Sequence, residues 1–348
     1  MHNPPESGMN PMPDRSLSPG KFLSACAHAL VYVMLFVGCQ SVVVGAYLSA
    51  LLTSNPAALT DPDAMSSLIT RIGEETVLIL LISNLLTILI VTAVMHLRRR
   101  DPLREMELYP VNPFRFPVFA LFGAAANTFV SITLSYIPLP EEIIAEHNAQ
   151  TMNLYEDYPV FVQMLSVAVI AGLTEELVFR GLVISRLRKG MGTAAAVIVS
   201  ALIFGFAHGS VLASGYAALL GLLLGALYAR YRSVLPGIIF HIFFNLTSFL
   251  LPEEGNVLLV LYILSVISLI YCVWKVFIRF PEFTDLFTDV RGMIQPVSEE
   301  QADIILELKK HQQQGRISAE QLSELHDRWE DSRAAYKKEK KYRRRGRK

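Results

Sequence analysis

The sequence predicts an all-α, polytopic membrane protein of about eight transmembrane helices with a short helical cytoplasmic tail. Of its 348 residues, 52% are hydrophobic and 18% are charged, against about 25% charged in soluble domains. Eight apolar stretches reach or approach the roughly 20 residues that a helix needs to cross a bilayer core. Lysine and arginine gather in alternate loops, as the positive-inside rule requires.

The apolar stretches lie between residues 22 and 277, and the fifth and sixth are short. We therefore divide the chain into a disordered leader (1–20), a transmembrane domain (21–280) and a soluble helical-hairpin tail (281–348). The stretches are Phe22–Leu52, Thr76–Leu97, Phe116–Ile137, Pro159–Phe179, Thr193–His208, Tyr216–Tyr228, Val234–Leu251 and Val257–Phe277.

The loops alternate in charge. Acidic residues precede the second, fourth and eighth stretches, whereas basic residues follow the second, fourth, sixth and eighth. These basic residues are Arg98, Arg99, Arg100, Arg104, Arg186, Arg188, Lys189, Arg230, Arg232, Lys275 and Arg279. We therefore expect an integral protein of a bacterial plasma membrane with both termini in the cytoplasm.

The tail contains signals for two short helices. Ser298 begins the first and Gly315 ends it, while Ser318 and Gln321 form a capping box for the second. The basic run 337–348 follows. We interpret this run as a membrane-proximal segment, because basic residues are attracted to anionic lipid and no nucleic-acid-binding motif accompanies them. No nucleic-acid partner is expected.

Ionisable residues inside predicted membrane helices are costly, so each one indicates a functional site. Glu176 and Arg180 are four residues apart and can pair on one helix face. Glu175 points about 100° away from that face and has no such partner on its own helix. The alternative is that both glutamates are solvated charges at the cytoplasmic interface.

Two further predicted spans contain histidines. His208 ends the fifth, and His241 lies in the seventh with Asn245 one turn later on the same face. A lone membrane histidine is more often a hydrogen-bond partner between helices than a catalyst. Two histidines, an asparagine and an unpaired glutamate on three spans are harder to explain in that way. Asn84 and Asn127 are interpreted as hydrogen-bonding residues between helices.

Three motifs in this order resemble a known family. The resemblance is to the CAAX prenyl endopeptidases and their bacterial relatives, the CPBP (CAAX protease and bacteriocin-processing, or Abi) intramembrane proteases. It covers about residues 170–250, less than a third of the chain. The motifs are Glu175-Glu176 with Arg180, Phe204 with His208, and His241 with Asn245.

The resemblance implies an intramembrane endopeptidase. Glu175, oriented by His208, would activate a water molecule for attack on a peptide bond. His241 and Asn245 would stabilise the oxyanion that develops. One glutamate and two histidines, with water in a fourth position, would also make a zinc set, so Glu175, His208 and His241 are candidate metal ligands.

The remaining motif residues would support this site. The resemblance implies that Glu176 and Arg180 hold the helix in place, and Phe204 is interpreted as a wall of the pocket. The three cysteines lie within apolar stretches, which argues against a disulfide framework or a cysteine-based zinc site.

The expected substrate is a membrane-embedded or lipidated peptide or protein. If the chain is bacterial, prenylated substrates are not expected, and peptide pheromones, bacteriocin precursors or other membrane proteins take their place. One alternative is a non-catalytic membrane scaffold or bacteriocin-immunity protein. A second is a transporter that uses the buried Glu and His as ligands, although we find no internal repeat.

The positions of the two histidines conflict with a simple bundle. Counted from the cytoplasmic loops, His241 lies about seven residues into its span and His208 about fifteen, a depth difference of roughly 12 Å. We therefore predict that the fifth span is tilted, begins deeper or is re-entrant, and that a polar cavity opens to the cytoplasm.

Overall fold

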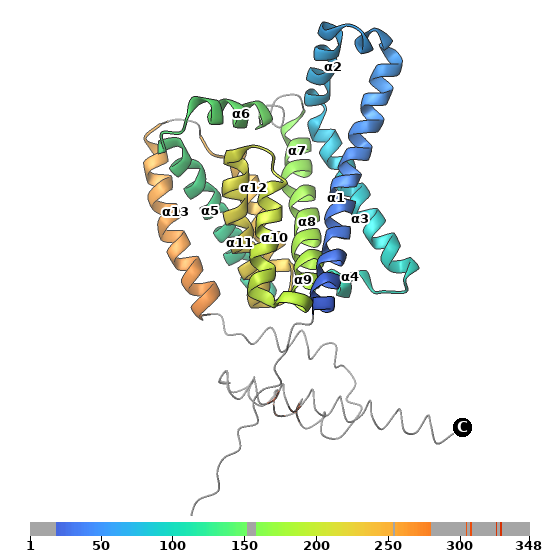
Figure 1. Cartoon of the computed structure of the whole chain (residues 1–348). Helices are drawn as coiled ribbons and strands as arrows, with labels where there is room; N and C mark the ends of the chain where they lie inside the picture. Colours follow the sequence, from blue (N-terminus) through green and yellow to red (C-terminus); the bar gives the residue numbers. More distant parts are fainter. Residues whose placement is uncertain are drawn as a thin grey trace, which may run out of the picture.

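The computed structural model describes residues 19–151, 158–252 and 255–279, together with residues 304, 307, 325 and 328. The described residues form a helical bundle without a β-strand (Figure 1). This confirms the all-α class. The expected leader and tail helices fall almost entirely outside the described residues, so they remain predictions.

A helix occupies each of the eight positions predicted for a span. Five described helices are long and apolar enough to cross a membrane: α1, α3, α5, α11 and α13, the last with its continuation η6. The count of eight crossings therefore stays a prediction. The helices other than the fourth are α1 (Pro19–Ser54), α3 (Thr76–Leu97), α5 (Phe116–Tyr136), α10 (Thr193–Phe206), α11 (Val211–Tyr231), α12 (Leu235–Ser248) and α13 (Val257–Val273), which continues into η6 (Trp274–Arg279).

The fourth position holds one continuous helix that alternates between α and π geometry. A π-helical turn contains more residues than an α-helical turn and shifts the backbone ladder, so carbonyl groups become available to other donors. Ser200 on α10 donates to one of them, the carbonyl of Phe179. The five segments are α7 (Val160–Gln163), η4 (Met164–Ile170), α8 (Ala171–Glu175), η5 (Glu176–Ile184) and α9 (Ser185–Met191).

Short helices cover the two ends of the bundle. At one end lie α2 (Pro62–Glu74) and α6 (Glu141–Thr151), which contain residues of the acidic loops (Figure 1). At the other end lie α4 (Pro102–Glu105) and α9, which contain residues of the basic loops. We call these the acidic end and the basic end. The remaining short elements are η1 (Pro56–Leu59) and η2 (Pro113–Arg115).

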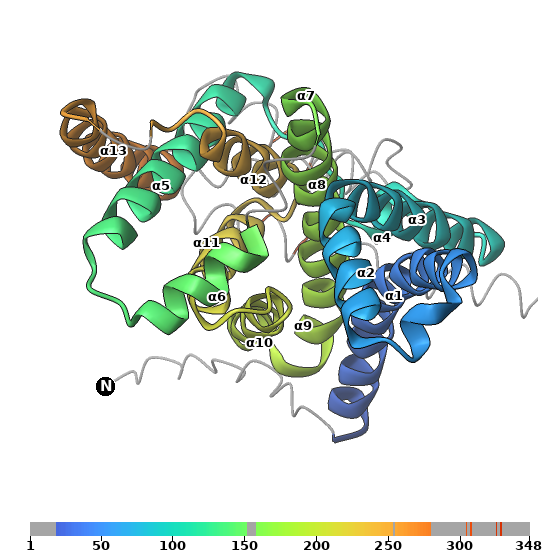
Figure 2. The same cartoon turned by 90° about the horizontal axis from the view of Figure 1, so that it is seen from above.

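The helices pack around the mixed α/π helix. α5 contacts both α12 and α13, α10 contacts α11, and α1 contacts α3 and α9. Seen from the acidic end, α6 crosses over α11 (Figure 2). Small residues permit these approaches, since a Cβ at Gly225 on α11 would lie 2.5 Å from Val197 on α10.

The two asparagines interpreted as interhelical residues behave differently. The Asn127 amide donates to the Ser248 hydroxyl at 2.9 Å and joins α5 to α12. Asn84 instead donates to the carbonyl of Leu80 on its own helix at 2.8 Å. The interpretation was therefore right for Asn127 and wrong for Asn84, whose amide nitrogen donates to a carbonyl one turn away on its own helix.

Candidate active site

A cavity of about 640 Å³ lies within the bundle, bounded by residues of α1, α3, α5, α6, α11 and the mixed helix. It brings together side chains from all three sequence motifs. Those that line it are Glu175, Phe204, His208, His241 and Asn245. The motifs are far apart in the sequence and carried by separate helices, so their meeting in one cavity is the central observation about this site.

Glu176 and Arg180 form the ion pair that their spacing predicts. The Arg180 Nη1 donates to Glu176 Oε1 at 2.7 Å, and the two side chains are 1% and 0% exposed, respectively. The guanidinium carbon of Arg180 also lies 4.5 Å from the centre of the Phe204 ring. A charge buried to this extent needs a partner, so the pair is a fixed part of the site.

Glu176 also holds His241, a contact that the sequence did not reveal. The His241 Nδ1 lies 3.0 Å from Glu176 Oε1. Because the carboxylate accepts a hydrogen bond, Nδ1 carries the hydrogen and Nε2 is the remaining nitrogen. That Nε2 lies 3.7 Å from Glu175 Oε2. Two adjacent glutamates therefore contact opposite nitrogens of one imidazole.

Gly237 leaves space for this arrangement. It lies one turn before His241 on α12, and a Cβ at this position would stand 2.6 Å from Glu176 Oε2. Any larger residue would therefore press on the carboxylate that connects Arg180 with His241. Glycine is required here by the close approach of a side chain, since its backbone is ordinary helix.

Glu175 is the more accessible of the two glutamates. Its side chain is 18% exposed, whereas that of Glu176 is fully buried. Glu175 ends α8 and stands between the two π-helical segments, facing the cavity. One carboxylate is thus neutralised by an arginine, and its neighbour is open to a molecule in the cavity.

Asn245 connects the π geometry to the cavity. Its Nδ2 donates to the carbonyl of Val167 in η4 at 3.1 Å. This bond fixes the side chain on the backbone of the mixed helix. The amide has a second hydrogen, and because Asn245 lines the cavity that hydrogen can be offered to a bound group.

His208 approaches the cavity from the turn that follows α10. Its Nδ1 lies 2.7 Å from the Phe204 carbonyl, which can only accept, so Nδ1 carries the hydrogen and a neutral ring leaves Nε2 as the acceptor. Its ring centre is 4.6 Å from that of Phe204. Within the described residues no hydrogen bond or ion pair joins His208 to Glu175, although both line the cavity.

The length of α10 reduces the conflict over depth. This helix has 14 residues, about 21 Å at 1.5 Å per residue, and so is shorter than the roughly 30 Å of a bilayer core. It ends at Phe206, which allows His208 to turn back toward the cavity.

The direction of the cavity differs from the prediction. Its lining reaches Thr76, Leu134, Leu212 and Ser248, which stand where α3, α5, α11 and α12 meet the acidic end. The sequence predicts that the basic loops lie in the cytoplasm and that the cavity also opens to the cytoplasm. That combination is wrong, because the cavity extends away from the basic end.

His147 on α6 is a site residue that the sequence reasoning missed. It lines the cavity, its Nδ1 lies 3.5 Å from the Ser210 hydroxyl, and its ring meets Tyr216 edge to face. Burial lowers the pKa of His147. The segment was treated as an acidic loop, yet Ile143, Ile144 and His147 have helical spacing, and this signal could have identified a covering helix.

The described residues contain no group of three His, Cys, Asp or Glu side chains that could hold a metal ion. The candidate ligands Glu175, His208 and His241 share a cavity but do not form such a set. Each imidazole offers only Nε2, because Nδ1 is engaged by Glu176 in His241 and by the Phe204 carbonyl in His208. The donors present do not fit a zinc site, and we derive no step that requires one.

Comparison with known families agrees with the motifs. Residues 157–247 match the model of the Rce1-like type II CAAX prenyl endopeptidase family. The matched segment contains the mixed helix, α10, α11 and most of α12. No curated protein and no solved structure matches the chain significantly.

Proposed function

We propose that this membrane protein is an intramembrane endopeptidase with Glu175 as its general base. The premise of this proposal is that residues 157–247 form an Rce1-like domain. One observation carries the proposal: Glu175 Oε2 lies 3.7 Å from Nε2 of His241, whose other nitrogen is bonded to buried Glu176. A partly exposed carboxylate beside a fixed imidazole in a cavity suits proton transfer and charge stabilisation.

In the proposed first step, Glu175 removes a proton from a water molecule as the water oxygen attacks the carbonyl carbon of the peptide. The product is a tetrahedral intermediate with an oxyanion. His208 Nε2 can accept a hydrogen bond from the same water, because its Nδ1 donates to Phe204. The C–N bond then breaks, and the leaving amine takes the proton from Glu175.

His241 and Asn245 are the proposed oxyanion donors. Asn245 has an amide hydrogen beyond the one that binds Val167, and His241 presents Nε2 when that nitrogen is protonated. Both side chains are fixed on the protein before substrate binds. Such preorganised donors need little rearrangement during the reaction, which is the main source of their catalytic effect.

The proposed substrate is a peptide or protein segment associated with the membrane. The cavity reaches Thr76 and Ser248 at the acidic end, and the basic end is the cytoplasmic one by the positive-inside rule. A substrate segment would therefore enter from the side opposite the cytoplasm. The substrate backbone around the scissile bond must be extended for that bond to reach Glu175. In a helical segment the amide groups would stay in hydrogen bonds within the helix.

The test is cleavage by the full chain reconstituted in liposomes that contain a library of membrane-anchored peptides. We expect Glu175→Gln to lower cleavage by about 100-fold to 10,000-fold, the usual contribution of a general base. Mass spectrometry of the products gives both the rate and the cleaved bond.

Ser131→Ala serves as the matched control, because Ser131 lines the same cavity and has no role in the proposed chemistry. Its cleavage should equal that of the unchanged protein. Equal cleavage by Glu175→Gln would exclude the glutamate mechanism. Transport or immunity that survives the same substitution would favour the alternative functions.

A further inference from the structure

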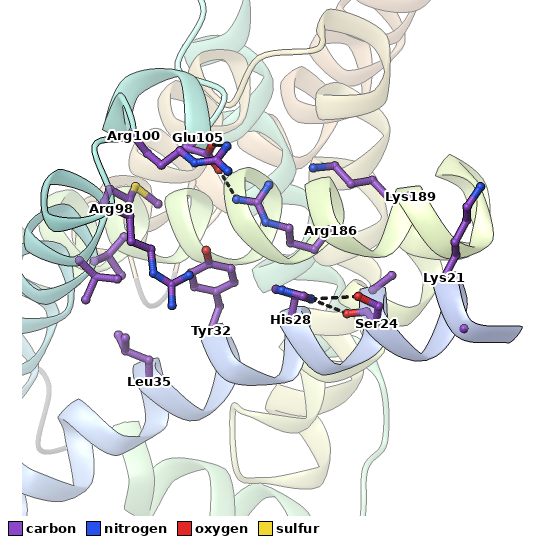
Figure 3. A pocket seen from close by; sticks show the side chains of 15 residues that line it. Lys21, Ser24, His28, Tyr32, Leu35, Arg98, Arg100, Glu105, Arg186 and Lys189 are labelled. Carbon is purple, nitrogen blue, oxygen red and sulfur yellow. Dashed lines mark hydrogen bonds and ion pairs between the residues drawn. The ribbon is translucent and has the colours of Figure 1, made fainter. Parts of the chain in front are cut away.

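A second cavity of about 1070 Å³ opens at the basic end, between α1, the end of α3, α4 and α9 (Figure 3). It lies on the opposite end of the bundle from the entrance side of the candidate active site. Five lysine or arginine side chains and a single carboxylate line it. The five cations are Lys21, Arg98, Arg100, Arg186 and Lys189.

The backbone after α3 places two of these cations. Arg99 has a φ of 53°, and its N–H donates to the His96 carbonyl while the N–H of Arg100 donates to the Met95 carbonyl. This is the Schellman arrangement that ends a helix with one left-handed residue. It reverses the chain, so that Arg98 and Arg100 both line the pocket.

The positive charges exceed what the pocket itself neutralises. Glu105 accepts from Arg100 at 3.0 Å and also pairs with Arg186. Within the described residues neither Arg98 nor Lys189 forms an ion pair. Burial and the neighbouring charge of Arg186 lower the pKa of Lys189, so a second positive charge is unfavourable there without an anion.

The other part of the lining is apolar. Leu35 of α1 and Val91, Val94 and Met95 of α3 lie deeper along their helices than the cations. Tyr32 stands between the two parts, with the Arg186 guanidinium 5.8 Å from its ring centre (Figure 3). A charged rim above an apolar wall matches a molecule with an anionic head and a hydrocarbon tail.

His28 adds a directed polar group. Its Nδ1 lies 2.6 Å from the Ser24 carbonyl and therefore carries a hydrogen, which leaves Nε2 for another partner. In Figure 3 the His28 and Tyr32 side chains extend from α1 toward Arg186. The sequence offered no reason to connect this histidine with Arg98 or Lys189.

We propose that this pocket binds the phosphate group of an anionic phospholipid, with the acyl chains along Leu35 and Val91. Basic pockets between transmembrane helices on the cytoplasmic side are a recurrent way to hold such head groups. Free phosphate offers the same charge, but it makes no use of the apolar wall. The proposal is independent of peptide cleavage.

The experiment is native mass spectrometry of the delipidated full chain titrated with lipid in mixed micelles. The probes are phosphatidylglycerol, phosphatidylcholine and inorganic phosphate. We expect phosphatidylglycerol to be retained in preference to phosphatidylcholine. The double substitution Arg98→Gln with Lys189→Gln should weaken binding of phosphatidylglycerol about 25-fold, which is roughly fivefold for each charge removed.

A matched pair of cations controls for the overall charge of this end. Arg99→Gln with Arg104→Gln removes the same charge from the neighbouring surface, and neither residue lines the pocket. This double variant should weaken binding less than about threefold, because charges outside the pocket are farther from the head group and are screened by salt. Thermal unfolding of both variants in detergent shows whether each remains folded.

Three results would overturn the proposal. Equal losses for the two double variants would mean that lipid responds only to the general surface charge. Equal retention of both lipids would remove the role of the anionic head group. Displacement of phosphatidylglycerol by inorganic phosphate at a similar concentration would assign the pocket to the free anion.

Discussion

Two glutamates at different places in the bundle pair with arginine, and their surroundings give the pairs opposite properties. Glu176 and Arg180 in the candidate active site are 0% and 1% exposed. Glu105 at the basic end is 20% exposed, and its partner Arg100 is 66% exposed. The distances are similar, at 2.7 and 3.0 Å, so burial is what distinguishes them.

The comparison shows what each pair can be used for. Breaking a buried pair leaves a charge without solvent, so the Glu176 carboxylate is fixed and can hold His241 in one orientation. An exposed pair contributes little to stability and exchanges partners easily. Arg100 can therefore turn from Glu105 to an incoming anion, whereas Arg180 cannot leave Glu176.

The largest expected effect is that of breaking the buried pair. Arg180→Ala should lower the free energy of unfolding by roughly 3–5 kcal/mol, because it leaves the Glu176 carboxylate buried without its arginine partner. Denaturant unfolding in detergent micelles measures this. A loss below about 1 kcal/mol would contradict the assignment of a fixed pair.

The double variant Glu176→Met with Arg180→Leu separates stability from activity. Apolar residues of similar size often replace a buried ion pair without loss, so most of the stability should return. Cleavage should stay low, because His241 has lost the carboxylate that fixes its Nδ1. Full recovery of both properties would show that Glu176 only supports the fold.

Gly237→Ala is expected to have the next largest effect. Its Cβ would stand 2.6 Å from Glu176 Oε2, and this carboxylate is held by Arg180 and His241. We expect a loss of roughly 1–3 kcal/mol in the free energy of unfolding. Cleavage should fall by up to about 100-fold, since displacements near 1 Å at a site can have that effect.

Gly172→Ala is the matched control for this change. Gly172 is also helical, but the nearest atom to its added Cβ is 3.6 Å away on Ile242, an ordinary contact. Alanine is favoured over glycine within helices by roughly 0.5–1 kcal/mol, so the control should be neutral or stabilised. A similar loss of stability from both substitutions would contradict the explanation that the new Cβ of Gly237→Ala presses on Glu176.

The smallest expected effect concerns Glu105 and pH. Partial burial opposes its ionisation, but hydrogen bonds and charges from Arg186 and Arg100 outweigh this and lower the pKa of Glu105. Its contribution to stability is therefore complete above the ordinary carboxyl pKa of 4.5 and is lost as pH falls through the lower folded pKa.

Glu105→Gln should accordingly lower the free energy of unfolding by no more than about 1 kcal/mol at neutral pH. The difference from the unchanged protein should shrink once the pH falls below about 4.5, which thermal unfolding at several pH values would show. A difference that grows toward acidic pH would have the wrong sign for a stabilising ion pair.

Part of this site was predictable because it depends on local spacing or charge. The four-residue separation of Glu176 and Arg180 predicted their pair, and a helix lies at each of the eight positions where the apolar runs predicted one. The hydrogen bond from His241 to Glu176 joins residues 65 positions apart. No local pattern contains such a contact, so it required the packing of α12 against the mixed helix.

The depth of the site residues in the membrane could also not be predicted from the sequence. The loops gave the alternation of charge but not the direction in which the cavity extends. The helical spacing around His147 could have indicated a covering helix, but its place in the cavity depends on α6 folding over α11. The π-helical geometry of η4 and η5 has no signal in the hydrophobic pattern, because both segments are apolar enough to be helical in either form.

The π-helical segment η4 also bears on how this helix tolerates changes in length. A π turn holds one residue more than an α-helix needs, so a single deletion within 164–170 can be absorbed by tightening that turn. The face that carries Glu175 and Glu176 would keep its direction. A single deletion within α8 could not be absorbed in this way, because α8 has no extra residue in its turn. Such a deletion would rotate that face by about 100°.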